Sequence, residues 1–331
     1  MKKPKLIEFD TYTTPDGSVY NFHNGVDKFL MSFEGTGMPN IDYITQQGPM
    51  QHGETVIDYR LAKRIIQYVV RRNACDRYDY WKNRFDMINM LRPNRQATTT
   101  IAPGYLRKII PGLDPIIHVP IVRQIDVFIE SGPVFAPRSL EDYDEFGITE
   151  ALRFVAPDPT FYDPTAVTVG WALTTQNHLV FPVTLLPYSG YPVDAGVDMI
   201  FGTNMIGADT TVLYLGNWPS FPTIVITGPV MGPIIYNLTT GKKIQLLYNV
   251  SGGEVVTISL PYGNKTVLNQ AGVNLSGTVT DDSDLADFAI EPTVPPTSAV
   301  AGLNTLRVIG GGAIMGTTSV VLSFFTRFIG L

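Results

Sequence analysis

Closely spaced turn residues between Phe33 and Leu91 constrain the fold of this chain more than any other feature. Glycine permits and proline presets the backbone conformations that chain reversals need, so the dense turns between residues 35 and 53 leave room only for short strands there. The turn residues are Gly35, Gly37, Pro39, Gly48, Pro49, His52 and Gly53. The block predicts a rigid framework and contains no recognisable catalytic motif.

A strand and a helix are expected directly after these turns. Residues 64–70 are apolar and rich in β-branched side chains, which predicts a largely buried strand. Asp76 and Asp79 suit the first turn of a helix, and Pro93 ends it. Trp81, Phe85, Ile88 and Leu91 recur at spacings of 4, 3 and 3, which makes one apolar stripe along this helix.

The second half of the chain predicts an all-β domain. Val256, Ile258 and Leu260 alternate with polar residues, as in a half-buried strand. Further strands are expected at 166–173, 198–214, 223–227, 244–248, 265–268, 306–309 and 319–328. Their number and spacing favour an antiparallel sandwich. The uncharged stretch 308–326 contains four glycines, so two strands explain it better than a membrane span.

Length and charge predict two domains. The 331 residues exceed the usual size of one domain. Residues 1–155 hold 19 basic and 19 acidic side chains, whereas residues 156–331 hold 5 and 11, so the net charge of −6 belongs to the second half. This change coincides with the proline-rich joint at 156–164, and we expect domains at 1–155 and 156–331.

The sequence offers no convincing catalytic, metal or cofactor site. The lone Cys75 excludes an internal disulfide framework, and the four histidines are not spaced as metal ligands. Gly311 and Gly316 have the spacing of a phosphate-binding loop, but Thr317 replaces its lysine. The aspartates at 281–287 could gather calcium, although a solvated acidic loop fits their spacing better. We therefore expect no enzyme and no cofactor.

Residues 60–95 form the strongest charge feature, with ten basic side chains against three acidic ones. Nucleic-acid binding is one interpretation, but no binding motif accompanies it and the whole chain is acidic. An interface with an acidic neighbour or subunit is favoured. The candidate interface residues are Arg71, Arg72, Arg77, Lys82 and Arg84.

The order of these motifs resembles that of phage distal tail proteins over nearly the full length. In the first half the matching elements are Gly35-x-Gly37-x-Pro39-x-Ile41, Gly48-Pro49-x-Gln51-His52-Gly53, Tyr80-Trp81, Leu91-Arg92-Pro93-Asn94, Leu106-Arg107-Lys108-Ile109 and Ile125-Asp126-Val127-Phe128. In the second half they are the joint at 156–164, residues 215–224, residues 237–242 and the ending 325–331. Thr160 departs from the bulky residue frequent at its position, and residues 95–122 and 179–210 look expanded.

The resemblance implies a structural protein at the distal end of a phage tail, made in the host cytoplasm. Residues 1–155 would form a six-membered ring that continues the tail tube and leaves a channel for DNA in transit. Residues 156–331 would form a galectin-like sandwich outside that ring. Its partners would be the tail tube protein on one face and the tail-tip hub, a lysin-like protein, on the other, with receptor-binding or fibre proteins as further candidates.

Two other functions stay open at this point. A carbohydrate-binding protein could use Trp171 of the sandwich to stack on sugar rings of a host cell surface, although a core position is the favoured interpretation of this residue. A cell-wall lysin is disfavoured because the chain lacks nucleophile and metal motifs.

Overall fold

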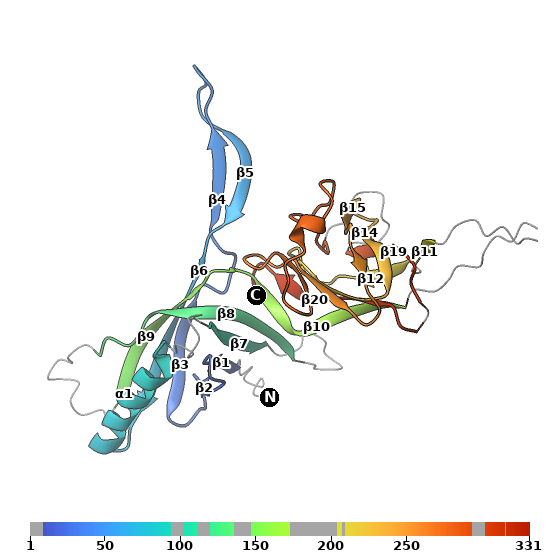
Figure 1. Cartoon of the computed structure of the whole chain (residues 1–331). Helices are drawn as coiled ribbons and strands as arrows, with labels where there is room; N and C mark the ends of the chain where they lie inside the picture. Colours follow the sequence, from blue (N-terminus) through green and yellow to red (C-terminus); the bar gives the residue numbers. More distant parts are fainter. Residues whose placement is uncertain are drawn as a thin grey trace, which may run out of the picture. The chain divides into compact units, whose positions relative to one another are not determined.

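The computed structural model describes residues 9–93, 102–110, 120–135, 147–172, 204–206, 209–292, 302–314 and 316–331. The chain forms two compact units (Figure 1). Unit 1 comprises Met1–Pro164 together with Arg327–Leu331, and unit 2 comprises Thr165–Thr326. The chain therefore passes between the units twice, first at the end of the joint expected at 156–164.

Unit 1 is built on antiparallel strands in the order β3-β6-β9-β8-β7-β1-β2. Their bounds are β1 Phe9–Thr13, β2 Val19–Asn21, β3 Lys28–Glu34, β6 Arg64–Asn73, β7 Gly104–Ile110, β8 Ile121–Ser131 and β9 Gly147–Ala156. The longest pairing joins β6 to β9, from Arg64 opposite Ala156 to Asn73 opposite Gly147. Alternate β6 residues point inward, as the β-branched sequence of residues 64–70 predicts.

Aromatic side chains dominate the core of unit 1. Phe22, Tyr68 and Phe154 contact one another edge to face, with ring centroids 4.9 to 6.3 Å apart. Such tilted contacts suit the charge distribution of aromatic rings and add to the hydrophobic gain of burial. Met87 and Leu91 of the helix close the core from one side.

Helix α1 (Arg77–Leu91) begins where its acidic first turn predicts. The side chain of Asp76 accepts a hydrogen bond from the Asp79 amide at 2.8 Å, which caps the first turn. The predicted apolar stripe does not face the core as a whole. Leu91 is buried, but Trp81, Phe85 and Ile88 are exposed, because Met87 instead occupies the inward face of the helix.

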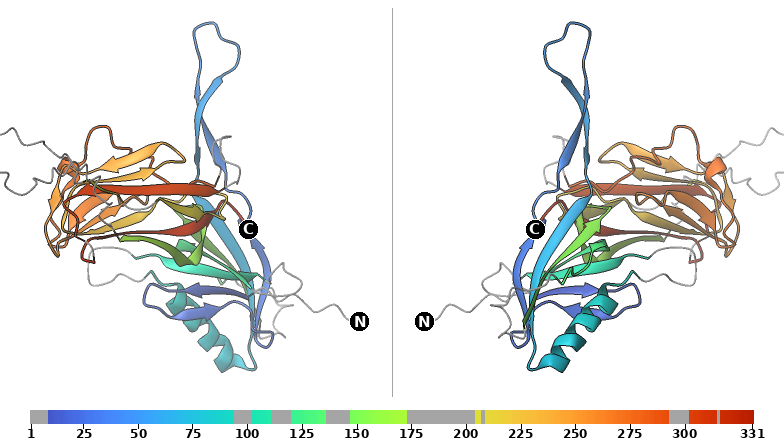
Figure 2. Two further views of the ribbon diagram at one scale, coloured as in Figure 1. Left: turned by 90° about the vertical axis from the view of Figure 1, so that its right-hand side faces the viewer. Right: turned by 90° about the vertical axis from the view of Figure 1, so that its left-hand side faces the viewer.

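Strands β4 (Ile41–Gln46) and β5 (Thr55–Leu61) form a separate two-stranded sheet. Figures 1 and 2 show this β4–β5 hairpin projecting away from the other strands of unit 1. Its two strands pair only with each other among the described residues. An isolated two-stranded hairpin is only marginally stable in water.

Unit 2 is an antiparallel sandwich. One sheet has the order β18-β17-β13-β20-β10, and the other has β11-β19-β14-β15, with β12 beside β19 and β16 beside β14. The bounds are β10 Phe161–Ala172, β11 Asn204–Ile206, β12 Thr210–Leu213, β13 Thr223–Thr227, β14 Val230–Asn237, β15 Lys242–Gln245, β16 Asn249–Val250, β17 Val255–Ser259, β18 Thr266–Asn269, β19 Leu303–Gly311 and β20 Ser319–Phe328, with a short 3-10 helix at Ser276–Thr278. The inner faces of both sheets supply one hydrophobic core.

The fold class predicted from the sequence is confirmed. The described residues are mainly β, with one α-helix in the first half and an antiparallel, galectin-like sandwich in the second. The uncharged stretch 308–326 lies mostly in β19 and β20 rather than in a helix. Among the described residues, no helix combines the length and apolar character needed to cross a bilayer.

Candidate assembly surfaces

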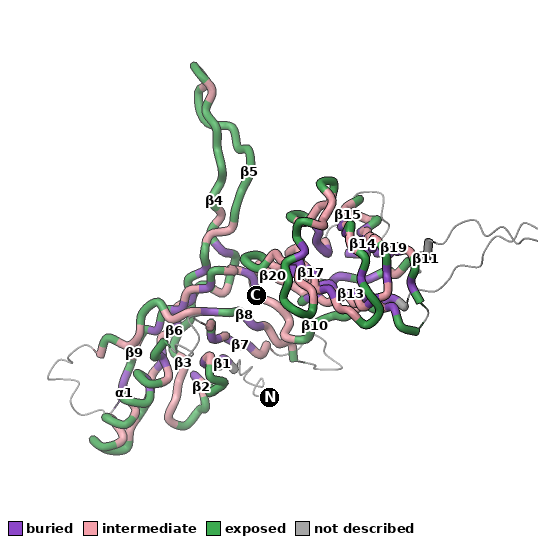
Figure 3. Tube along the Cα trace, viewed as in Figure 1, coloured by how far each residue is buried: buried purple, intermediate pink, exposed green. Residues whose placement is uncertain are grey.

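The β4–β5 hairpin is exposed over nearly its whole length (Figure 3). Tyr43 and Tyr59 lie opposite each other on its two strands and are 60% and 51% exposed. Other large apolar side chains on the hairpin are also open to solvent, namely Ile44, Val56 and Ile57. Exposed apolar surface on unpaired strand edges is characteristic of a surface that another chain covers.

Four of the predicted turn residues, Gly48, Pro49, His52 and Gly53, lie at the tip of this hairpin between β4 and β5. The Gly48 carbonyl accepts from the Gln51 amide at 3.1 Å, and the Gln51 side chain accepts from the Gly48 amide at 2.9 Å. Met50 has a positive φ of 64° and is fully exposed. Gly53 also has a positive φ, of 83°. These bonds give the tip a defined conformation without a core beneath it.

Two other predicted turn residues, Gly35 and Gly37, lie at the base of the hairpin and contact the guanidinium of the buried Arg64. The Arg64 guanidinium donates hydrogen bonds to the backbone carbonyls of Gly35, Gly37, Pro159 and Ile329. It also lies 4.8 Å from the centroid of the Phe161 ring. Burial lowers the pKa of Arg64 to about 10. Gly35 has a φ of +86°, and a Cβ there would lie 2.0 Å from the Ile65 carbonyl oxygen, so only glycine fits.

The segment at residues 327–331 completes this base. In addition to the bond from Arg64, the Leu331 amide donates to the Thr36 carbonyl at 3.1 Å. Arg327 forms an ion pair with Asp158 and donates to the Thr160 hydroxyl at 2.7 Å. The 327–331 segment is thus an integral part of unit 1.

The second exposed apolar surface is the outer face of α1, formed by Tyr78, Trp81, Phe85 and Ile88. These side chains are 76%, 45%, 61% and 46% exposed. Arg84 lies beside this face, 4.8 Å from the Trp81 ring and 4.2 Å from the Phe135 ring. Helix α1 therefore presents apolar side chains on two sides, one toward the core and one toward solvent.

The basic residues of the 60–95 stretch do not form one surface. Arg72 is buried and donates to the Asn83 carbonyl at 3.1 Å, so it anchors α1 and cannot take part in the predicted interface. Arg71 is half-buried and contacts Asn73 at 3.1 Å. Arg77 and Lys82 are exposed on α1. Arg95 lies outside the described residues.

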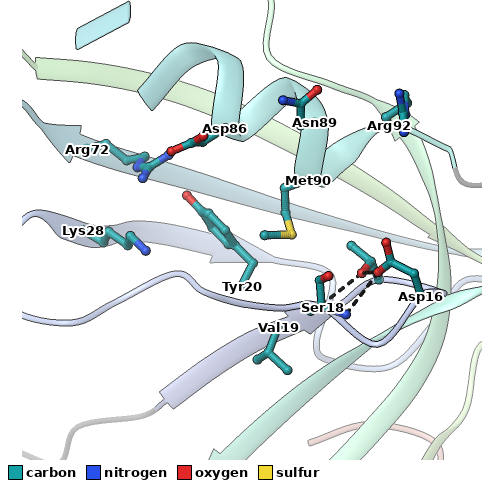
Figure 4. Close-up of a pocket in the computed structure, with 11 residues that line it drawn as sticks. Asp16, Ser18, Val19, Tyr20, Lys28, Arg72, Asp86, Asn89, Met90 and Arg92 are labelled. Carbon is teal, nitrogen blue, oxygen red and sulfur yellow. Dashed lines mark hydrogen bonds between the residues drawn. The ribbon is translucent and has the colours of Figure 1, made fainter. Parts of the chain in front are cut away.

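A pocket of about 440 Å³ lies between α1 and the strands β2, β3 and β6 (Figure 4). Tyr20, Lys28 and Met90 surround it, and burial is the main cause that raises the pKa of Tyr20. Its charged residues are of both signs, three cations and two carboxylates. The charged residues are Asp16, Lys28, Arg72, Asp86 and Arg92.

The other residues considered for sugar or metal binding are Trp171, the aspartates of the loop at 281–287 and the histidines. Trp171 is only 4% exposed and belongs to the core of unit 2, so its ring is not available to stack on a sugar. Asp282 and Asp284 pair with Lys243 and Lys242 rather than gathering around a cation site. Within the described ranges, no group of three or more His, Cys, Asp or Glu side chains could hold a metal ion. His118 and His178 lie outside these ranges.

The fold of this chain is similar to that of a solved phage protein. Dit (gp 19.1) of phage SPP1 aligns with 97% of this chain and 99% of its own, with a TM-score of 0.56 and 14% identity. The chain has the distal tail protein fold. The SPP1 protein is described as a paradigm of the hub adsorption apparatus in phages that infect Gram-positive bacteria. The resemblance inferred from the motifs is thereby confirmed at the level of the fold.

Other comparisons add little to this distal tail protein fold. A chain of the phage P2 baseplate in its activated conformation aligns with 92% of this chain and 98% of its own, at 11% identity. Its TM-score of 0.39 is too low to establish a shared fold. No protein-family model matches the sequence, and no curated protein does.

Proposed function

We propose that this protein is a structural component of a phage tail, a six-membered ring that joins the tail tube to the tail-tip hub. The distal tail protein fold supports the tail location. The β4–β5 hairpin is the observation that carries the assembly, because Tyr43 and Tyr59 lie exposed on a hairpin without a partner among the described residues.

A ring requires a repeated contact between two different surfaces of the subunit. A contact between identical surfaces closes a pair and goes no further, whereas a heterologous contact that closes generates a ring. The hairpin provides one such surface. Residues 1–155 are proposed to form the ring, with DNA passing through its centre and residues 156–331 outside it. The role is one of geometry, with no catalytic step.

The contacts beyond the ring are also proposed. The tail tube protein would lie on one face and the tail-tip hub on the other. Arg71, Arg77, Lys82 and Arg84 are proposed to meet an acidic surface in the assembled tail, since opposite charges orient two proteins as they meet. The assembled protein would reside in the virion.

The oligomeric state of the full chain tests the ring. Light scattering should give six times the 36.5 kDa chain mass, and electron microscopy should show rings with open centres. Replacing both Tyr43 and Tyr59 by serine should abolish the rings while leaving thermal unfolding unchanged, because both side chains are exposed.

The matched control is Tyr262→Ser, which changes a tyrosine of unit 2 that is 69% exposed. This variant should form rings as the unmodified chain does. A chain that stays monomeric at every concentration would contradict the ring. Intact rings in the Tyr43→Ser/Tyr59→Ser variant would show that the hairpin does not join the subunits.

A further inference from the structure

The outer face of α1 has the residue spacing of a helix-pairing surface. Tyr78, Trp81, Phe85 and Ile88 follow one another at intervals of 3, 4 and 3 residues. These are the a and d positions of two heptads, which face a partner helix in a coiled coil. All four side chains are exposed, and the core-facing residue Met87 lies on the other side of the helix.

Three of the residues that flank this face are cationic, whereas the second e position is Asn89 and the last g position is the buried Leu91. In the same heptad frame, Arg77 and Arg84 occupy g positions and Lys82 occupies an e position. Residues at e and g set the choice of partner through their charge. The two acidic residues of α1, Asp79 and Asp86, fall at b positions, away from a partner. The outer face therefore combines an apolar centre with a positive border.

A second copy of α1 would not complement the positive charges beside this face. A parallel pair would place Arg77 of one helix near Lys82 of the other, and an antiparallel pair would place like residues against one another. Like charges at these positions destabilise the pair. Within the described residues α1 is the one α-helix, so none of the described elements supplies the complementary helix.

We propose that the outer face of α1 binds an acidic amphipathic helix of another protein, with apolar residues at its a and d positions and carboxylates at e and g. Each aromatic ring buries roughly 150–250 Å². Three aromatic rings on two heptads stay below the ~800 Å² per partner of a standard interface. The contact is thus a small one that adds to others. It does not depend on the proposed ring.

Two matched peptides test the proposal with the full chain. Both have three heptads with leucine at a and d, and they differ only in carrying glutamate or lysine at e and g. Fluorescence anisotropy of the labelled peptides should show the glutamate peptide binding at least tenfold more tightly than the lysine peptide. The change Phe85→Asp should abolish this binding, and Arg77→Glu with Lys82→Glu should reverse the preference.

The control is Leu215→Asp, at a residue of unit 2 that is 74% exposed. It should bind the glutamate peptide as the unmodified chain does, and all variants should keep their thermal midpoint. Binding of neither peptide, or equal binding of both, would overturn the proposal. Self-association that Phe85→Asp removes would do so as well, because it would make a second copy the occupant.

The hairpin variant Tyr43→Ser/Tyr59→Ser separates this proposal from the proposed function. It should lose rings and still bind the glutamate peptide. A chain that forms no rings but binds this peptide would contradict the ring alone, whereas a chain that forms rings and binds neither peptide would contradict this proposal alone.

Discussion

Arg64 shows how one side chain can hold several backbone segments in unit 1. It is 3% exposed, and its guanidinium donates to four carbonyl oxygens from three separate regions of the chain. Hydrogen bonds that involve a charged group contribute about 1.5–3 kcal/mol each, so these four bonds make Arg64 a large contributor to the stability of unit 1. A planar fork of donors suits this task, and a lysine ammonium cannot reproduce it.

We expect Arg64→Lys to lower the free energy of unfolding by about 2 kcal/mol or more, because fewer of the four carbonyls keep a donor. Urea unfolding of the full chain measures this. The matched control is Arg60→Lys, where an exposed arginine lies 3.4 Å from Asp42. Exposed ion pairs contribute little, so this control should change stability by less than ~0.5 kcal/mol. Equal effects of the two changes would refute the role given to Arg64.

At the scale of elements, the sequence predicted strands well where apolar residues alternate. Val256, Ile258 and Leu260 are all fully buried, as expected. Strand β14 was not predicted, because Gly232 and Pro233 interrupt its pattern and a register shift between Met231 and Ile234 accommodates them. Interrupted strands of this kind give no regular period.

The sequence predicted the candidate assembly surfaces less well than the strands. The spacing of Trp81, Phe85 and Ile88 predicted a stripe, but spacing alone does not say whether a stripe faces a core or a partner. Likewise, Arg72 and Arg77 look alike in a basic stretch, although one is buried and the other exposed. The four acceptors of Arg64 come from regions far apart in sequence, so no local motif marks this residue.

The acidic loop at 281–287 carries a pH dependence of its own. The Asp284 carboxylate accepts from the Lys243 amide at 3.0 Å and from the Lys242 side chain at 3.2 Å. The hydrogen bond from the Lys243 amide has the largest effect, and together with the Lys242 side chain it holds the pKa of Asp284 below its ordinary value of 3.8. A lowered folded-state pKa stabilises the protein above the unfolded value, and this stability is lost as pH falls through the folded pKa.

We therefore expect Asp284→Asn to lower the thermal midpoint of unit 2 at neutral pH. The difference from the unmodified chain should shrink on acidification below the ordinary aspartate value of 3.8. Thermal unfolding followed from pH 7 downward measures it, with Asp281→Asn as the neighbouring control. The idea fails if the difference between Asp284→Asn and the unmodified chain is the same at every pH.

At the scale of the whole molecule, the 327–331 segment belongs to a unit whose other residues end at Pro164. We expect deletion of residues 329–331 to destabilise unit 1 by about 1–3 kcal/mol, since Arg64 loses an acceptor and Thr36 loses a donor. Hydrogen exchange should accelerate in β6 and stay unchanged in β13 and β17. The control Leu331→Ala keeps the backbone bond and should have little effect. Equal acceleration in both units would argue against a role confined to unit 1.

This return of the chain also sets the order of events during synthesis. Residues 327–331 leave the ribosome after all of unit 2, so the base of the β4–β5 hairpin stays unfinished while the sandwich is already free to fold. A nascent chain would thus carry an incomplete unit 1 until Ile329 has left the ribosome. Growing chains on one messenger RNA that contact each other early would therefore do so while the base of the β4–β5 hairpin is still incomplete.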